Sequence, residues 1–285
     1  MRRVGVLPLR ALPLRAWIAL GVAGFWLLCA FAAPLLSPFD PLRSGSPLLL
    51  PLARDGMGMH LLGTDMLGRD ILSRLIWGAR PVLLWSVLAT VCAYAVGIGG
   101  GMAAGYASGA ADRLFSFLAT VMQSFPLLIL YLLIVMRLGA SGFNIIVAVT
   151  FSTAPAIFRI VRALVAVERG KDYVLAAVMQ GERPWRILLF DLLPNVAGPL
   201  LVDACLRLGY TAITIGLLGF LGLGLPPPTP DWGSMINEGR GMAIVFPHLI
   251  LFPCLAISSL MLSLSVLADA LGHRGDSTPL RRTNA

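Results

Sequence analysis

The stretch DYVLAAVMQGERPWRILLFDLLPN, residues Asp172–Asn195, is charged and polar, and it lies between two long apolar runs. Its first part, through Ala176-Ala177, predicts one short helix, and Gly181 predicts a break after it. The amphipathic part that begins at Trp185 predicts a second helix. In a chain that is otherwise apolar, a segment of this kind is where a water-soluble partner can bind.

The composition places the rest of the chain in a membrane. Hydrophobic residues make up 58% of the 285 residues and charged residues 13%, against roughly 25% charged residues in soluble domains. The mean hydropathy is +0.84. The sequence therefore predicts an all-α integral membrane protein. The net charge of +8 does not indicate nucleic-acid binding, because the arginines are dispersed between apolar runs rather than grouped with aromatic residues on one face.

Six apolar runs are long enough to cross a bilayer, which takes about 20 helical residues. They are Ala16–Leu36, Val82–Ala104, Leu114–Met136, Phe143–Val161, Val196–Leu221 and Ile244–Leu271. The first run follows several arginines, as in a signal peptide, but it exceeds the about 7–15 apolar residues of such a peptide. We interpret it as an uncleaved transmembrane helix.

The distribution of arginine and lysine predicts the sidedness of these helices. If the N-terminus is cytoplasmic, both tails and the Asp172–Asn195 segment receive most of the basic residues, as the positive-inside rule requires. The predicted organisation is a cytoplasmic tail (1–15), the first transmembrane helix (16–36), an extracytoplasmic loop with an amphipathic segment (37–81), a core (82–271) that contains the cytoplasmic loop 170–195, and a cytoplasmic tail (272–285).

The outer loop contains HLLGTDMLGRDILSRLIWGAR, His60–Arg80, which is not apolar enough to span a membrane. Gly63-Thr64-Asp65 predicts a turn and a helix cap. An amphipathic helix is expected after it, with its apolar residues along one side: Leu67, Ile71, Leu72, Leu75 and Ile76. Such a helix would lie at the outer membrane surface; packing on the bundle and contact with a partner are equal alternatives.

Two features within the apolar runs predict specific contacts. Gly97, Gly101 and Gly105 recur on one face of the second run and predict close packing against another helix. Asp203 and Arg207 lie four residues apart in the fifth run, so the two side chains can meet and neutralise each other. The pair either lines a translocation path and contacts a charged solute or forms a structural ion pair; the sequence leaves both open.

A catalytic function has little support in this sequence. His60, His248 and His273 are scattered, and each is expected to be a loop or interfacial residue without catalytic partners. The four cysteines lie in apolar runs without metal-ligand spacing. The absence of a Walker A motif, GxxxxGK[ST], means that this chain does not hold ATP by that route. We therefore expect a transport protein without a metal site, with an ion-coupled secondary transporter as the alternative.

Several ordered regions resemble one protein family. Asp172–Asn195 resembles the EAA loop of the permease subunits of bacterial ABC importers. Leu62–Arg80 resembles the LGTDxLGRDxxSRxxxGAR pattern, and Gly219–Met235 the FLGLGxxPPxxxWGxM signature, of the dipeptide, oligopeptide and nickel class. Two residues depart from the loop pattern: Leu175 stands where the family usually has Glu, and Asp191 where related peptide permeases often have His.

The resemblance implies the type I ABC importer permease fold, in the bacterial inner membrane, with peptides or similar small solutes, or nickel or a metal chelate, as cargo. The implied partners are a second homologous permease in a heterodimer, two ATPase subunits that bind ATP and magnesium, an extracytoplasmic substrate-binding protein and membrane lipid; this chain itself would bind no cofactor. ATPase coupling is implied for Tyr173, Leu175, Ala176, Ala177, Gly181, Arg186, Asp191 and Pro194. Contacts at the outer surface are implied for Asp65, Arg69, Asp70, Pro227 and Trp232.

Overall fold

The apolar runs form long helices in the computed structural model, which describes residues 13–107 and 109–275. The long helices are α1 (Leu14–Leu36), α2 (Ile71–Ala107), α5 (Gly142–Glu168), α8 (Leu193–Phe220) and α10 (His248–Gly275). The shorter elements are β1 (Ala53–Asp55), β2 (Gly58–His60), α3 (Gly109–Gln123), α4 (Leu127–Leu138), α6 (Asp172–Met179), α7 (Pro184–Arg186), the π-helix Ile187–Leu192, α9 (Trp232–Gly239) and the 3₁₀-helix Arg240–Met242.

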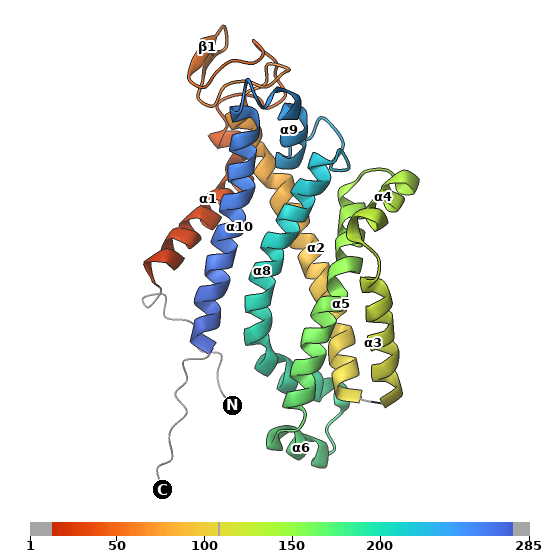
Figure 1. Ribbon diagram of the computed structural model, residues 1–285. Helices are drawn as coiled ribbons and strands as arrows, with labels where there is room; N and C mark the ends of the chain where they lie inside the picture. Colours follow the sequence, from red (N-terminus) through yellow and green to blue (C-terminus); the bar gives the residue numbers. More distant parts are fainter. Residues whose placement is uncertain (1–12, 108, 276–285) are drawn as a thin grey trace.

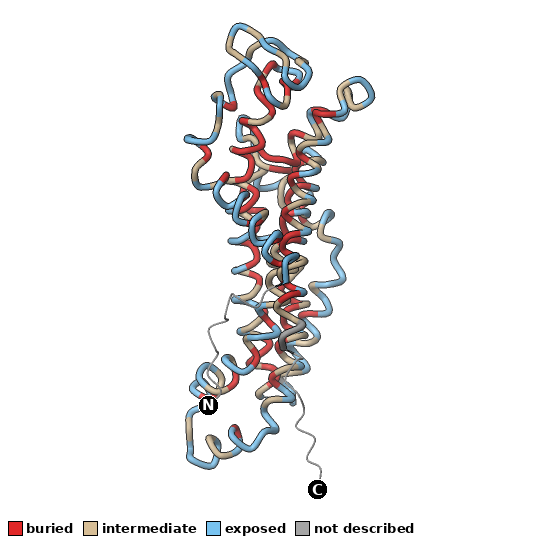
Figure 2. The backbone as a smooth tube through the Cα atoms, turned by 90° about the vertical axis from the view of Figure 1, so that its left-hand side faces the viewer, coloured by how far each residue is buried: buried red, intermediate tan, exposed pale blue. Residues whose placement is uncertain are grey.

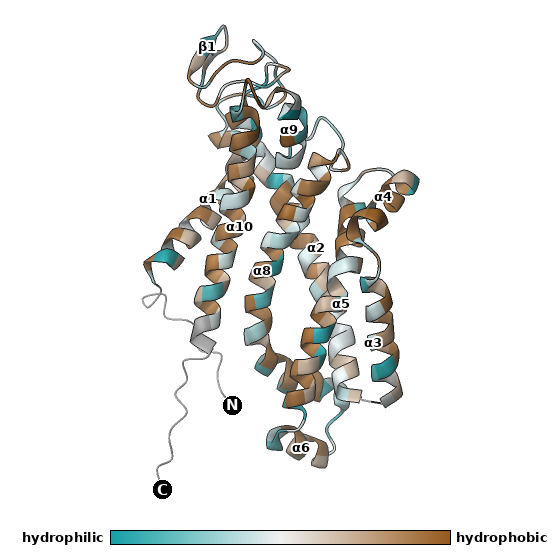
Figure 3. Ribbon diagram, viewed as in Figure 1, coloured by the Kyte–Doolittle hydropathy of each residue, from teal (hydrophilic) through white to brown (hydrophobic). Residues whose placement is uncertain are grey.

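Within the described ranges, five helices are long and apolar enough to cross a membrane, and the bent pair α3–α4 would make a sixth crossing. Hydrophobic residues cover these helices over most of their length (Figure 3). Buried positions run along the interior of the bundle, and exposed positions dominate the loops at both ends (Figure 2). The protein is thus the all-α membrane bundle that the composition predicts.

The three glycines of α2 let this helix lie directly against α5. A Cβ atom on Gly97 would come within 2.7 Å of Ile157, and one on Gly101 within 2.7 Å of Val161. At Gly105 the new atom would lie 2.8 Å from the Arg162 carbonyl oxygen. No real Cβ atom fits at such distances, so close helix packing is confirmed as the reason for this glycine series.

The helix predicted in the outer loop packs on the bundle, one of the expected alternatives, and does not lie at the membrane surface. Residues 61–70 form turns and isolated bridges, and the helix that begins at Ile71 continues without a break to Ala107. The apolar side chains of its first turns are buried: Ile71, Leu75 and Ile76 pack with Trp232 and other residues of α9 and α10. Because protein rather than lipid covers this apolar face, α2 rises out of the membrane as one rod.

The third apolar run is not one continuous helix. It is divided into α3 and α4, whose axes bend by 78° at the break. Pro126 stands at the N-cap of α4 in an extended conformation. Proline supplies no backbone N–H and disfavours the helical conformation in the preceding residue, Phe125. Pro126 therefore lies between the end of one helix and the start of another.

The long helices connect two opposite ends of the molecule, one formed by α6 and the other by the β1–β2 hairpin and α9 (Figure 1). Most of the predicted cytoplasmic tails, residues 1–12 and 276–285, lies outside the described residues. The assignment of the α6 end to the cytoplasm therefore stays a prediction from the arginine distribution.

Cysteine labelling tests this sidedness. In a background without Cys29, Cys92, Cys205 and Cys254, an impermeant thiol reagent added outside is expected to label Ser46→Cys, because Ser46 is exposed in the outer loop. The matched control is Gln180→Cys in the exposed loop after α6, which should react only after the membrane is opened. Labelling of the Ser46 variant from the cytoplasmic side alone would contradict the six-crossing arrangement.

Candidate functional site

The segment between α5 and α8 folds as two short helices, as the sequence predicts. Helix α6 ends at Gly181, whose φ of 74° lies in the left-handed region. The Gly181 N–H bonds to the Val178 carbonyl oxygen at 3.0 Å, and the Glu182 N–H reaches back to that of Ala177 at 3.1 Å. This pair of bonds is a Schellman motif, which ends a helix and turns the chain. Pro184 then stands at the start of α7, where its missing N–H costs nothing.

A π-helix over Ile187–Leu192 joins α7 to α8, so residues 184–220 form one continuous helical rod. Ile187 and Leu192, the first and last residues of this π-helix, are fully buried. Together with Val174 of α6, they belong to the hydrophobic cluster that includes Val161 and Val165 of α5. The two short helices are therefore packed onto the ends of α5 and α8. A displacement of this segment would be carried into both long helices.

The outward face of the segment is apolar and exposed. Its exposed hydrophobic side chains are Leu175, Val178, Met179, Trp185, Leu189 and Phe190, with Met179 at 81% exposure. Beside them lies an open hollow bordered by Glu182, Arg183, Arg186 and Asp191. An exposed apolar patch with a polar border is typical of a protein interface. The segment, called the coupling loop from here on, thus has the surface that is typical of a protein interface.

Tyr173, one of the predicted coupling residues, has a hydroxyl that is hydrogen-bonded within this chain. Its hydroxyl donates to Glu168 Oε2 at 2.8 Å and accepts from Asn195 Nδ2 at 3.3 Å. Burial, followed by the bond to Glu168, raises the pKa of Tyr173 to about 12, so the hydroxyl keeps its proton at neutral pH. This hydroxyl links the end of α5 to the start of α8. Glu168 and Asn195 carry no sequence signal of this pairing.

We expect Leu175→Glu to weaken binding of the ATPase partner. The Leu175 side chain is half exposed within the apolar patch, and a carboxylate placed against an apolar partner loses hydration without gaining a bond. The matched control is Leu175→Met, which keeps an apolar side chain of similar size. Co-purification of the ATPase with the tagged chain, normalised to membrane abundance, measures the effect. If the glutamate instead improves ATP-coupled transport, the partner's groove is polar at this position.

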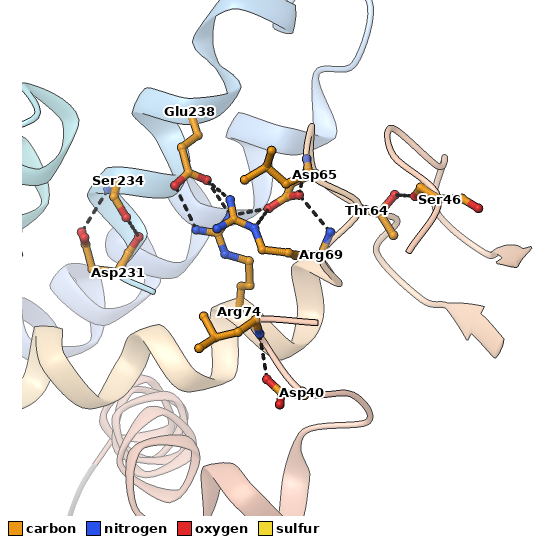
Figure 4. Close-up of polar contacts among 11 residues, drawn as sticks. Asp40, Ser46, Thr64, Asp65, Arg69, Arg74, Asp231, Ser234 and Glu238 are labelled. Atoms are coloured by element: carbon orange, nitrogen blue, oxygen red, sulfur yellow. Dashed lines mark hydrogen bonds and ion pairs between the residues drawn. The ribbon is translucent and has the colours of Figure 1, made fainter. Parts of the chain in front are cut away.

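At the opposite end, a network of four charges joins the outer loop to α9 (Figure 4). Asp65 accepts bonds from the side chains of Arg69 and Arg74, and Arg69 Nη2 and Arg74 Nη1 both donate to Glu238 Oε2 at 2.6 Å. The Arg74 side chain is only 3% exposed. Two carboxylates balance two guanidinium groups, so the burial of Arg74 is compensated. The network fixes the outer loop to α9.

A second polar group supports the start of α2. Asp70 Oδ2 accepts from the Ser73 N–H at 2.7 Å and caps this helix. Asp70 Oδ1 lies 2.9 Å from His60 Nδ1, and His60 Nε2 lies 3.2 Å from Asp55 Oδ1. Backbone N–H groups of Ser46 and Met57 hold the pKa of Asp55 at about 2, so Asp55 is ionised at neutral pH. His60 lies in the hairpin of the outer loop, in agreement with the loop alternative of the prediction, and it is fully buried there.

The residues predicted to contact a partner outside have mostly internal roles. Asp65, Asp70 and Trp232 are 7%, 1% and 0% exposed. Trp232 donates from Nε1 to the Leu75 carbonyl oxygen at 2.9 Å. These three side chains are used within the chain and do not offer a contact surface as it stands. Of the remaining two, Arg69 is held in the charge network, and Pro227 is exposed.

Asp231 caps α9 and has no counterpart in the sequence predictions. Its Oδ1 accepts from the N–H groups of Gly233 at 2.9 Å and Ser234 at 3.0 Å, as Figure 4 shows for Ser234. Burial raises the pKa of this carboxyl. The sequence contained a signal for this cap: an Asp directly before a short amphipathic stretch, which is typical of a helix N-terminus. Glu238, the other missed residue, had no such signal because its partners lie more than 160 positions away.

The predicted pair in the fifth apolar run meets as expected. Arg207 Nε donates to Asp203 Oδ2 at 2.6 Å, and the Tyr94 hydroxyl of α2 donates to the same oxygen. The side chains of Asp203 and Arg207 are 22% and 18% exposed. The cluster thus links α8 to α2 and leaves part of each charge open to the surroundings, so both a structural and a solute-binding role are compatible with it.

Comparison with known proteins identifies the class to which this arrangement belongs. Residues 96–275 match the family described as binding-protein-dependent transport system inner membrane component. The chain is 35% identical over 262 residues to the glutathione transport system permease protein GsiD of Pectobacterium atrosepticum, covering 90% of this chain and 86% of that protein. It is 37% identical over 259 residues to the di/tripeptide transport system permease protein DppC of Pseudomonas aeruginosa, covering 89% and 86%.

A solved structure shares the fold. The chain resembles the MetNI methionine ABC transporter in inward-facing conformations with a TM-score of 0.55 at 18% identity, over 70% of this chain and 96% of that chain. The chain belongs to the family of inner-membrane permease components of binding-protein-dependent ABC importers. The resemblance seen in the sequence motifs is therefore confirmed.

Proposed function

We propose that this chain is one of two permease subunits that together carry peptides or similarly sized solutes across the bacterial inner membrane. A substrate-binding protein delivers the solute from outside, and two ATPase subunits bind ATP and magnesium and drive the cycle. Both termini of the chain and the coupling loop face the cytoplasm. A different, homologous permease supplies the other half of the path.

The coupling loop is the observation that carries this proposal. It presents an apolar patch with a charged border at one end of the bundle, and it is packed onto the ends of α5 and α8. An ATPase that grips this patch can move two membrane-spanning helices at once. The positive-inside distribution of arginine supports a cytoplasmic position for the loop.

The choice of a peptide as solute rests on the relatives. The two permeases compared above are named for glutathione and for di- and tripeptides, all short peptides or peptide-like molecules. We choose this class over nickel or a metal chelate for that reason. The binding protein, rather than this chain, selects among such solutes.

Uptake into proteoliposomes tests the proposal. The chain is reconstituted with its second permease, the two ATPases and the binding protein, and labelled dipeptide and labelled glutathione are supplied. We expect uptake of at least one of them to require both ATP and the binding protein. Uptake that continues without ATP and stops when an ionophore collapses the proton gradient would instead support a secondary transporter.

A further inference from the structure

An apolar groove lies between α1 and α2 on the membrane-facing surface. It has a volume of about 420 Å³ and is lined by Leu27 and Phe31 of α1 and by Leu83, Leu84, Val87 and Leu88 of α2. Its size falls in the range of about 300–1,000 Å³ that small-molecule sites occupy. Phe31 is 81% exposed and Leu84 53%. One charged residue, Arg80, completes the lining of this groove.

The Arg80 side chain is held in place by the backbone of α1. Its Nε donates to the Ala30 carbonyl oxygen at 2.6 Å, and Nη2 donates to that of Phe31 at 3.1 Å. Pro34 explains why the Ala30 carbonyl is free: proline has no N–H, so it cannot make the helix bond to the residue four positions earlier. Arg80 thus replaces the hydrogen bond that Pro34 removes from α1.

No carboxylate in the described part of the chain balances the charge of Arg80. Among residues 13–107 and 109–275, no carboxylate lies within ion-pair distance of Arg80. A guanidinium group has five N–H donors, and the two carbonyl bonds use only two of them. The ring of Trp77 lies 4.8 Å from the guanidinium carbon and contacts the cation without neutralising it. The remaining N–H donors of the Arg80 guanidinium are suited to bind an anion.

The depth of Arg80 indicates which anion is available. Helix α2 has 37 residues, about 55 Å at 1.5 Å per residue, whereas the hydrocarbon core is about 30 Å thick. Arg80 stands just before the apolar run Val82–Ala104, at the outer edge of the hydrocarbon. Trp77, one turn earlier, is of the residue type that gathers at this interface. Phospholipid phosphate groups lie at the same level.

We propose that the groove between α1 and α2 binds one phospholipid of the outer leaflet, with its phosphate on Arg80 and an acyl chain along Leu84, Val87 and Leu88. The phosphate supplies the missing counter-charge, and the acyl chain covers apolar side chains that protein leaves open. The lipid then fills the seam along which α1 meets the rest of the bundle. This site is independent of the solute and of the coupling loop.

Native mass spectrometry of the full chain, extracted in mild detergent and supplied with phosphatidylglycerol, tests the site. We expect the wild-type chain to retain one phospholipid. Arg80→Gln removes the charge, and Val87→Trp fills the groove without touching the carbonyl bonds of Arg80. Each is expected to lower retention about fivefold or more, the factor that one basic side chain contributes near anionic lipid. The control, Leu262→Trp on α10, changes another exposed apolar residue and should retain the lipid.

Three results would overturn the proposal. Equal retention in all variants would mean that the lipid binds elsewhere or without specificity. Loss in Arg80→Gln alone, with full retention in Val87→Trp, would remove the groove from the site. In the assembled transporter, a crosslink from Leu84→Cys to the second permease would show that a protein helix, not a lipid, occupies the groove.

Discussion

Asp203→Asn alone and Arg207→Gln alone are each expected to lower the membrane abundance of this permease, and the double change to restore much of it. Each single change leaves one charge without its partner between α2 and α8. Breaking a fully buried pair costs about 3–5 kcal/mol. Here about 1–2 kcal/mol is expected, because about a fifth of each side chain is exposed and solvent screens part of the interaction. This is the outcome for a structural pair.

Measuring uptake beside abundance distinguishes a solute-binding pair. If the two charges contact the solute, abundance holds in all three variants while uptake falls, and the double variant does not recover. Tyr94→Phe serves as the control, since it removes only the hydroxyl that donates to Asp203 and leaves the pair intact. Its expected cost is about 0.5–1.5 kcal/mol. Single variants with no change in either quantity would show that neither role applies.

Gly181→Leu is expected to reduce solute-stimulated ATP hydrolysis to near the basal rate while the chain still inserts into the membrane. Gly181 has a φ of 74°, and a left-handed conformation costs a residue with a Cβ about 1–2 kcal/mol. Relief of that strain would undo the Schellman motif and redirect α7. The exposed patch would then no longer present both short helices to the ATPase in one orientation.

Gly181→Asn is the matched control for this prediction. No atom lies within 4 Å of a Cβ placed on Gly181, so neither side chain is excluded by space. Asparagine adopts the left-handed conformation more readily than leucine and should keep most of the stimulated activity. The stimulated ATPase rate of the reconstituted complex, normalised to abundance, gives the comparison. Equal activity of the leucine and asparagine variants would show that the turn at Gly181 does not determine coupling.

The sequence predicted best those features that depend on neighbours along the chain. Apolar runs identified the spans, Gly181 marked the turn of the coupling loop, and the spacing of four residues placed Asp203 beside Arg207. The three glycines of α2 also predicted close packing against another helix, because glycines that recur on one helix face typically allow such packing. In each case the physical cause lies within a few turns of one helix.

The outer end could not be predicted in the same way, because its contacts join residues far apart in sequence. The amphipathic pattern correctly indicated an apolar face for Ile71, Leu75 and Ile76, but not that α9 and α10 cover it. Leu67, assigned to the same face, precedes the helix and is exposed. Asp65 and Arg69 were predicted to be contacts at the outer surface. In the structure, Arg69 bonds to Asp65 and to Glu238, which lies 169 positions away in the sequence. The size of the bend at Pro126, 78°, could not be predicted from the sequence either.

The continuous rod of residues 184–220 gives the permease a lever. Its 37 residues span about 55 Å at 1.5 Å per residue, and Asp203 lies close to the midpoint. A rod that rocks by about 5° around this fulcrum moves each end by about 2 Å in opposite directions. Tyr94 and Arg207 bond to Asp203 where such a rod moves least. A small push at α7 would therefore reach the end of the rod beside α9 with its direction reversed, while the bonds at the fulcrum stay intact.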